Sequence, residues 1–516
     1  MEMTNRSFSV AGIFADHMVL QRDKPVAIWG KSQRAQTLRF LIDGREAARV
    51  QAGAGEWKAQ LPAMPAQKDM CLEIAGEDTA EPLRFSHTAV GELWIAGGQS
   101  NMEFILKYDA EAKAVIAGAD DGYIRYYETP RIKFEGQERE TDLSAFGVWR
   151  RFTPEEAPCF SAVALYFALR LRKQYPDMPI GIVGCSFGGS SAAAWMDERF
   201  LAEDEELRIY LDDYRQGLAK LDMRQYLERD KKQRHITENP LAKRLMAWIM
   251  KNTPGPRLTA FIGTMLKGSA AVLPVIGPLS ENRPAGLYHT MLSRIAGFSA
   301  RGVIWYQGET DNVKASRYAR LFSALIRCWR YAWGEDLPFI FVQLAPFEQW
   351  LGIPGTDFYL VREQQEIVSK TVPGTYMASI MDWGSRLDVH PKHKRPVGER
   401  LALLALGKVY GLDLLSESPE AETAIISDGE LVISFRHAGR GLTVKGYALK
   451  SLKFMLDENC IEARGCTVAG NEVRCRIDGL ETAKSVDIRF AWENYTEVNL
   501  YNSAGLPAKP FRMIVR

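Results

Sequence analysis

Two apolar stretches of this chain each end in a glycine-rich turn, and this feature constrains the fold more than any other. Residues 91–98 read GELWIAGG and precede QSNM, and residues 179–189 read PIGIVGCSFGG. Short apolar runs bounded by glycine are typical of buried strands in a parallel sheet. Residues 160–175 lie between them and have apolar side chains at helical spacing. Strands that alternate with helices predict an α/β fold with a parallel sheet covered by helices on both faces.

The two ends of the chain have a different pattern. Residues 1–90 and 416–516 contain short runs separated by Gly, Pro and Asp, which predict two small β-sandwich-like domains around an α/β domain at 91–415. Residues 200–282 interrupt the α/β pattern and are too long for a loop, so we interpret them as a helical insertion with helices at 205–220 and 240–251. An insertion of this kind shapes a substrate entrance, covers surface or mediates subunit contact, and these roles stay open.

Charge and composition exclude several classes of protein. The chain has 65 basic and 64 acidic residues, whereas nucleic-acid and anionic-membrane binding need a surface of one sign, so neither partner is expected. Seven cysteines without C-x-x-C spacing argue against a disulfide framework or a zinc site. Residues 268–280 are apolar but too short to span a bilayer and contain two prolines, which favours a buried segment. Because the N-terminus lacks the pattern of a signal peptide, a cytoplasmic location is expected, and an extracellular one would need a leader ahead of this sequence.

Two serines lie in turns that suit a nucleophile. Ser186 is the central residue of G-x-S-x-G at 184–188, the pattern of the α/β-hydrolase nucleophile elbow. Ser100, in GQSNM, also follows a strand and lies at the sheet edge where α/β folds bind ligands. The alternative for Ser100 is a helix cap, with Glu103 completing a capping box. The residues by themselves do not choose between the two serines.

A serine nucleophile needs a base, and His390 has the most suitable position among the seven histidines. It lies in the polar turn DVHPK, between a strand-like run at 376–382 and a helical pattern at 396–406. A histidine on a loop at the edge of the sheet is able to reach a nucleophile there. Asp388, two residues earlier, is the candidate for the acid that orients the imidazole.

Several long motifs resemble the sialate O-acetylesterase family of the SGNH-hydrolase group. They occur in the family's order and cover nearly the whole chain except the insertion: FADHMVLQRDKPVAIWG at 14–30, GELWIAGGQSNMEF at 91–104, PIGIVGCSFGGSSAAAW at 179–195, GVIWYQGETDN at 302–312 and DVHPKHKRPVGERLA at 388–402. The resemblance implies an SGNH-type three-layer α/β/α domain. It also implies a serine esterase that removes O-acetyl groups from sugars, with O-acetylated sialic acid as the first candidate.

The resemblance also implies roles for individual residues. The nucleophile would be Ser100 rather than Ser186, with His390 as its base. The oxyanion hole would consist of the backbone N–H groups of Ser100 and Gly189 and the side-chain amide of Gln307. This mechanism needs no metal and no other cofactor. Three further residues are expected to support the site: Gln99, Asn101 and Glu309.

One departure from the group concerns the acid. The SGNH pattern D-x-x-H places the acid three residues before the histidine, but position 387 is leucine. The orienting partner of His390 is therefore either the Asp388 carboxylate or a main-chain carbonyl near it.

Other functions remain compatible with the sequence. The same chemistry would serve an esterase of acetylated xylan or another plant polysaccharide. An α/β-hydrolase using Ser186, or a non-catalytic carbohydrate-binding protein, would use different parts of the chain. The expected partner in the preferred interpretation is a small acetylated sugar or oligosaccharide, and an oligomeric state is neither required nor excluded.

Overall fold

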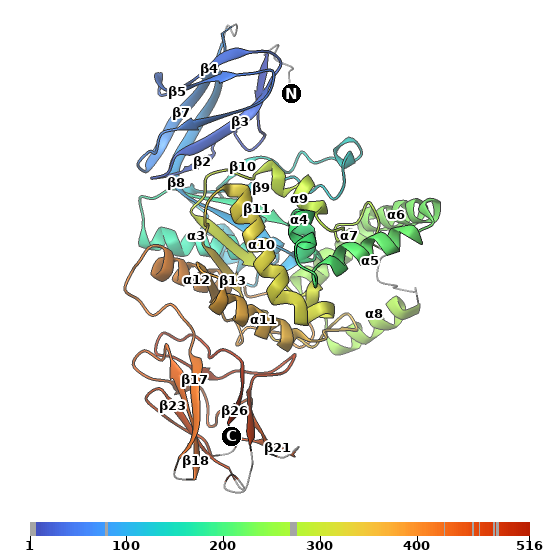
Figure 1. The fold of residues 1–516 in the computed structure, drawn as a ribbon, viewed down its shortest axis with the longest axis vertical. Coiled ribbons are helices and arrows are strands. Elements are labelled where there is room, and N and C mark those ends of the chain that lie inside the picture. Colours follow the sequence, from blue (N-terminus) through green and yellow to red (C-terminus); the bar gives the residue numbers. More distant parts are fainter. Residues whose placement is uncertain are drawn as a thin grey trace. The chain divides into compact units, whose positions relative to one another are not determined.

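The computed structural model describes residues 7–77, 81–268, 276–427, 429–456, 459–463, 465–477, 480 and 485–515 (Figure 1). The chain is a mixed α/β protein that divides into two compact units. Unit 1 contains Met1–His235, Ile276–Trp305 and Ala324–Phe339. Unit 2 contains Ile236–Val275, Tyr306–Ser323 and Ile340–Arg516.

The N-terminal part of unit 1 consists of short strands, as the sequence predicts. Strand β3 lies between β1 and β6, and β4 pairs with β5 and β7, all antiparallel. In β6 the buried residues Trp57, Ala59 and Leu61 alternate with exposed ones, because successive side chains point to opposite faces of a sheet. The strands are β1 (Phe8–Val10), β3 (Val26–Ser32), β4 (Gln36–Ile42), β5 (Arg45–Ala52), β6 (Gly55–Leu61) and β7 (Gln67–Ala75).

Strand β8 (Leu83–Gly98) links this part to the main sheet of unit 1. Its first half pairs with β7, and its second half pairs in parallel with β11 (Ile180–Ser186). The strand order within unit 1 is β10-β9-β11-β8-β12, with β9 at Asp121–Glu128, β10 at Trp149–Phe152 and β12 at Gly302–Tyr306. Since β8 continues through residue 90, no break in secondary structure marks the predicted domain boundary there.

The main sheet is mixed rather than purely parallel, which corrects the prediction. Strand β10 runs antiparallel to β9, and both were missed in the sequence. The connection from β9 to β10 contains one 3₁₀ turn and no crossover helix. A chain that returns without such a crossover pairs antiparallel to the strand it has just left.

Two helical predictions in unit 1 have different outcomes. The helix predicted at 160–175 is confirmed as α3 (Ala162–Gln174), which is capped by Ser161 through a 3.2 Å bond from the Ala164 N–H to its Oγ. Residues 288–300 (YHTMLSRIAGFSA) also have a helical pattern in the sequence, but α9 (Gly286–Thr290) is much shorter, because Met291 after it has φ −121° and ψ −59°. Only a short 3₁₀ turn follows it.

Unit 2 contains strands and helices of the central region, followed by a β-rich C-terminal part. Strand β13 (Phe339–Val342) is followed by Gln343, whose N–H donates to the carbonyl of Ala378 at the end of β16 (Thr375–Ala378) over 2.9 Å. The helices are α11 (Phe358–Thr371) and α12 (Arg395–Leu404). The apolar run PFIFVQLA at 338–345 and the strand-like run at 376–382 predict these two strands, and the helical pattern at 396–406 predicts α12.

The C-terminal part of unit 2 has two four-stranded antiparallel sheets, with strand orders β17-β18-β23-β22 and β21-β20-β24-β26. Residues of both sheets, including Phe435, Phe454 and Phe490, share one hydrophobic core. The strands are β17 (Glu420–Ser427), β18 (Glu430–Arg436), β20 (Leu452–Leu456), β21 (Asn459–Glu462), β22 (Thr467–Ala469), β23 (Glu472–Arg476), β24 (Val486–Phe490) and β26 (Phe511–Val515).

One disulfide lies in this C-terminal part, where the sequence had indicated none. Cys466 and Cys475 are joined by an S–S bond of 2.05 Å. Cys466 directly precedes β22 and Cys475 lies in β23, and the antiparallel pairing of these strands brings the two residues together. The spacing of nine residues carried no recognisable signal, because only the register of the hairpin determines the contact.

The insertion is helical, as predicted. The predicted helices correspond to α5 (Arg208–Ala219) and α7 (Pro240–Lys251), and α6 (Met223–Glu238) and α8 (Pro256–Gly268) are additional. Within the predicted buried segment at 268–280, residues 269–275 lie outside the described residues. In the described part of the chain, no helix has both the length and the apolar character needed to cross a membrane.

Candidate active site

The turns of both candidate serines lie at the same edge of the main sheet. Strands β8 and β11 are parallel, and Gly98 at the end of one lies opposite Ser186 at the end of the other. Gly98 has φ 137°, a backbone conformation that favours glycine, and the chain turns there toward Ser100. This is the carboxyl edge of the parallel strands, where α/β folds bind their ligands.

Ser100 does not cap the helix that follows it. It is the first residue of α1 (Ser100–Glu103), and the cap position belongs to Gln99, whose carbonyl accepts the N–H groups of Met102 and Glu103 at 2.9 Å each. The capping-box interpretation is therefore wrong. Gln99 and Asn101 on either side are buried, whereas Ser100 is half-buried.

Ser186 belongs to a strand rather than to a turn, and it pairs with Gly98 at the strand end. It ends β11 and is buried, with 7% of its surface exposed. The turn comes after it, where the Phe187 N–H donates to the Gly98 carbonyl over 3.1 Å and the Ser190 N–H donates to the Phe187 carbonyl over 3.3 Å. A nucleophile elbow instead places the serine in the turn itself, so the geometry around Ser186 differs from that motif.

Gly189 lies at the exposed tip of this second turn, with φ 72°. Its carbonyl accepts a 2.9 Å bond from the Asn282 side chain, whose oxygen accepts the Ser191 N–H at 2.7 Å. Ser190, which is fully buried, donates its hydroxyl to the Phe187 carbonyl over 2.7 Å. These bonds fix the backbone on both sides of Gly189.

Glu103 connects the two turns, which the sequence did not reveal. Its Oε2 accepts the Gly188 N–H at 2.5 Å, and its Oε1 accepts Arg131 Nη1 at 2.5 Å. Arg131 also donates twice to Glu128, over 2.9 and 2.6 Å. A Cβ atom on Gly188 would lie only 3.1 Å from Glu103 Oε2 and 3.5 Å from the Cβ of Ser100. The sequence indicated Glu103 only as part of a capping box with Ser100, and no motif in the sequence indicated a role for Arg131.

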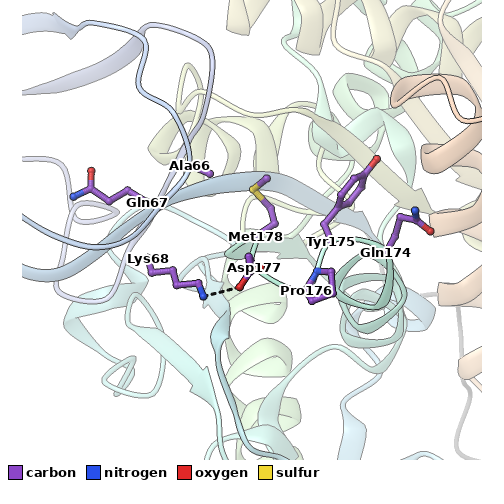
Figure 2. Close-up of a pocket in the computed structure, with 8 residues that line it drawn as sticks. All are labelled: Ala66, Gln67, Lys68, Gln174, Tyr175, Pro176, Asp177 and Met178. Atoms are coloured by element: carbon purple, nitrogen blue, oxygen red, sulfur yellow. Dashed lines mark hydrogen bonds and ion pairs between the residues drawn. The ribbon is translucent and has the colours of Figure 1, made fainter.

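A surface pocket of about 530 Å³ lies at the opposite end of β11 (Figure 2). Residues 66–68 and 174–178 line it, and Lys68 Nζ and Asp177 Oδ1 form an ion pair of 2.8 Å across it. Residues 174–178 precede β11, whereas the two serines follow or end their strands. The pocket therefore does not belong to the serine edge of the sheet.

In unit 2, Gln307 directly follows β12 and is fully buried. Its Oε1 accepts the Tyr318 hydroxyl at 2.8 Å, and its Nε2 donates to Asp311 Oδ2 over 2.6 Å. Because an ionised carboxylate only accepts hydrogen bonds, this pair fixes which end of the amide is the donor. Glu309, two residues later, is also buried, and its carbonyl accepts the Asn312 side chain at 2.6 Å at the start of a 3₁₀ helix.

Asp388 and His390 interact mainly through the backbone of the histidine. Asp388 Oδ1 accepts the His390 N–H at 2.9 Å but lies 3.9 Å from Nδ1 of the ring, too far for a hydrogen bond. Its Oδ2 binds Lys392 Nζ at 2.8 Å and the Thr253 hydroxyl at 3.0 Å. The carboxylate therefore fixes the turn that carries His390.

His390 has a strongly shifted acidity. The residue is 4% exposed, and its ring contacts the Trp350 ring edge-on at a centroid distance of 5.1 Å. Burial, followed by the nearby cations Lys394 and Lys392, holds the pKa of the imidazole well below its ordinary value of 6.5. The ring is therefore neutral at physiological pH, which is the form that accepts a proton.

The insertion contacts this histidine turn within unit 2. Besides the bond from Thr253, the carbonyl of Ile249 at the end of α7 accepts Lys392 Nζ at 3.2 Å. The sequence left the role of the insertion open. In the structure, the end of α7 helps to position residues 388–392.

Comparisons with known proteins relate the chain to carbohydrate esterases. The profile of the carbohydrate esterase, sialic acid-specific acetylesterase family matches residues 278–405. Sialate O-acetylesterase of Homo sapiens is 24% identical over 548 residues, which cover 98% of this chain and 92% of the human protein. The protein of the same name from Pongo abelii is 24% identical, covering 98% of this chain and 92% of that protein. The crystal structure of a carbohydrate acetylesterase from Xanthomonas citri is 30% identical with a TM-score of 0.75, over 98% of this chain and 99% of that one.

Proposed function

This chain belongs to the sialic acid-specific acetylesterase family of carbohydrate esterases, and from this premise we propose that it removes O-acetyl groups from sialic acid by serine catalysis. One observation within unit 1 carries the proposal. The GQSNM turn and the turn at 187–190 end neighbouring parallel strands, and Glu103 bonds one to the other. A serine at the carboxyl edge of the sheet thereby gains fixed backbone N–H groups beside it, as acyl transfer requires.

In the proposed mechanism, Ser100 is the nucleophile. Its Oγ attacks the acetyl carbonyl while Nε2 of His390 takes its proton. The imidazolium then returns the proton to the sugar oxygen, which leaves as an alcohol. A water molecule, activated by the same histidine, releases acetate from Ser100 and restores the enzyme.

The tetrahedral intermediate carries a negative charge on one oxygen, and we assign three donors to it. They are the backbone N–H groups of Ser100 and Gly189 and the side-chain amide of Gln307. The fixed orientation of that amide between Tyr318 and Asp311 supports this role, because a donor that needs no reorganisation stabilises the charge most.

We assign Asp388 a positioning role rather than that of a directly bonded triad acid. Its carboxylate binds the backbone N–H of His390 and lies 3.9 Å from the ring nitrogen. We assign supporting roles to Gln99 and Asn101, which are buried on either side of Ser100, and to Glu309, which is buried two residues after Gln307. The three-domain organisation with boundaries at 90 and 416 remains part of this proposal.

The substrate is tested by measuring acetate release from O-acetylated sialic acid and from acetylated xylo-oligosaccharides with the same enzyme preparation. We expect a higher kcat/KM for the sialic acid. The Ser100→Ala variant, purified in the same way and assayed on both substrates, measures the background from contaminating esterases. A higher kcat/KM for the xylo-oligosaccharide would support the esterase mechanism but identify a plant polysaccharide, rather than sialic acid, as the substrate.

We expect Glu103→Ala to lower kcat about a hundredfold with little change in KM. The substitution removes the acceptor of the Gly188 N–H, so the neighbouring N–H of Gly189 loses its fixed direction, and loss of one oxyanion donor costs about 10²–10³ in rate. Glu103→Gln keeps an acceptor and should lose less. Steady-state kinetics on 4-nitrophenyl acetate provide the measurement.

Glu128→Gln is the matched control for Glu103, because Glu128 shares the Arg131 partner but its side chain forms no hydrogen bond with the turn at 187–190 among the residues that the structure describes. It should retain most of kcat. Equal losses in the Glu103 and Glu128 variants would mean that the acidic pair only stabilises the fold.

A further inference from the structure

The insertion contains a helix with an unusual exposed surface. In α7, Leu241, Leu245 and Trp248 are 72%, 53% and 45% exposed. Residues four and seven positions apart lie on the same face of a helix, so the three side chains form one stripe. Ile249 follows Leu245 by four residues and is only 3% exposed, so the packed side of α7 begins at one edge of the stripe. The stripe is thus apolar surface that the described part of the chain leaves exposed.

Basic side chains border this stripe. Arg244 follows Leu241 by three residues and precedes Trp248 by four, and Lys251 follows Trp248 by three, so both lie next to the stripe. Both are exposed, and neither forms an ion pair with any residue that the structure describes. The positive charge at this face is therefore not neutralised by the described part of the chain.

The charge of the surrounding segment has one sign. Residues 239–280 contain five basic residues and no Asp or Glu: Lys243, Arg244, Lys251, Arg257 and Lys267. Phe261 on the adjacent helix α8 adds a further large apolar side chain, 62% exposed. The net charge of +1 for the whole chain conceals this local excess, and the expectation that no membrane takes part depended on that total.

We propose that α7 docks on an anionic lipid surface, with Leu241, Leu245 and Trp248 entering the interface and Arg244 and Lys251 binding lipid head groups. An apolar stripe with Leu and Trp, bordered by Lys and Arg, is the pattern of helices that lie in the plane of a membrane interface. Such a helix lies on the bilayer and does not span it. A second copy of this chain fits the face poorly, because two such faces would bring like charges together.

The docking face belongs to the same helix whose end contacts the His390 turn. The carbonyl of Ile249 and the hydroxyl of Thr253 bind Lys392 and Asp388 at and just beyond the C-terminal end of α7, next to the stripe. Docking would therefore bring the proposed catalytic histidine turn close to acetylated sugars carried on lipids. This consequence depends on the proposed function, but the docking itself does not.

The test is flotation of the full-length protein with vesicles of phosphatidylcholine alone and with vesicles containing about 30% phosphatidylserine. We expect binding to the anionic vesicles only, and its loss when NaCl is raised from about 0.05 to about 0.5 M, since salt screens surface charges. The double variant Arg244→Glu/Lys251→Glu should bind at least about tenfold more weakly. The triple variant Leu241→Ser/Leu245→Ser/Trp248→Ser should lose flotation.

The matched control is Ile425→Ser/Ile426→Ser, which removes two exposed apolar side chains from β17 and should float like the wild type. Circular dichroism verifies that each variant is folded. Absence of flotation with anionic vesicles at low salt would overturn the proposal, as would equal binding to both vesicle types. A concentration-dependent dimer that the triple variant abolishes, without vesicle binding, would assign the face to a second copy. If Ser100→Ala proves fully active, the proposed function fails while the flotation result still decides the docking.

Discussion

Ser100→Ala is expected to lower kcat/KM for 4-nitrophenyl acetate by about 10⁴-fold or more, because loss of the nucleophile in a serine hydrolase leaves only the residual effect of binding and the oxyanion hole. Ser100 begins α1 at the carboxyl edge of the sheet, and the turn with Gly188 lies directly beside it. Acetate release from O-acetylated sialic acid should fall in parallel. The folded state of the variant is verified by its thermal unfolding, since the half-buried hydroxyl contributes little to packing.

Ser186→Ala is the matched control, because Ser186 ends the neighbouring strand and is the rival nucleophile. We expect it to retain kcat/KM within about tenfold, in line with a buried residue that only packs at the end of β11. A dead Ser186 variant beside an active Ser100 variant would reverse the assignment of the nucleophile and remove the proposed oxyanion hole with it.

His390→Ala should be as severe as Ser100→Ala and lower kcat/KM by about 10⁴-fold or more, because the serine then has no base. The pH profile of the wild type gives a second readout. Burial and the cations Lys394 and Lys392 disfavour the imidazolium and lower the pKa of His390, so its neutral, proton-accepting form persists at more acidic pH. The acid limb of the kcat/KM profile is therefore expected below pH 6.5. Activity should be lost only as the pH falls through the lowered pKa of His390.

Two variants examine this assignment further. Lys394→Gln removes a cation near the ring and should move the acid limb toward higher pH, because the imidazolium becomes easier to form. Asp388→Asn should cost well below the roughly 10⁴-fold that loss of a directly bonded triad acid causes, because Asp388 binds the backbone of His390. An acid limb unchanged by Lys394→Gln, or an active His390→Ala enzyme, would contradict the role of this histidine.

The local elements of the fold were accessible from the sequence. Apolar runs and helical spacing depend on the immediate neighbours of each residue, so the helices predicted at 160–175 and 240–251 lie close to the observed α3 and α7. Strands β9 and β10 were missed, because their polar and aromatic residues do not form an apolar run. The antiparallel direction of β10 depends on the path of its connection, which no local pattern encodes.

The sequence by itself determined the family, the α/β pattern of the central region between two β-rich ends, and the residue types that suit acyl transfer. It also supplied the charge excess of residues 239–280. Only the tertiary structure decided that Gln99 rather than Ser100 caps α1, that Glu103 bonds to Gly188, and that Asp388 binds the His390 backbone. The physical reason is that a hydrogen bond depends on the separation and direction of two groups, which strand register and turn geometry fix between residues far apart in the chain.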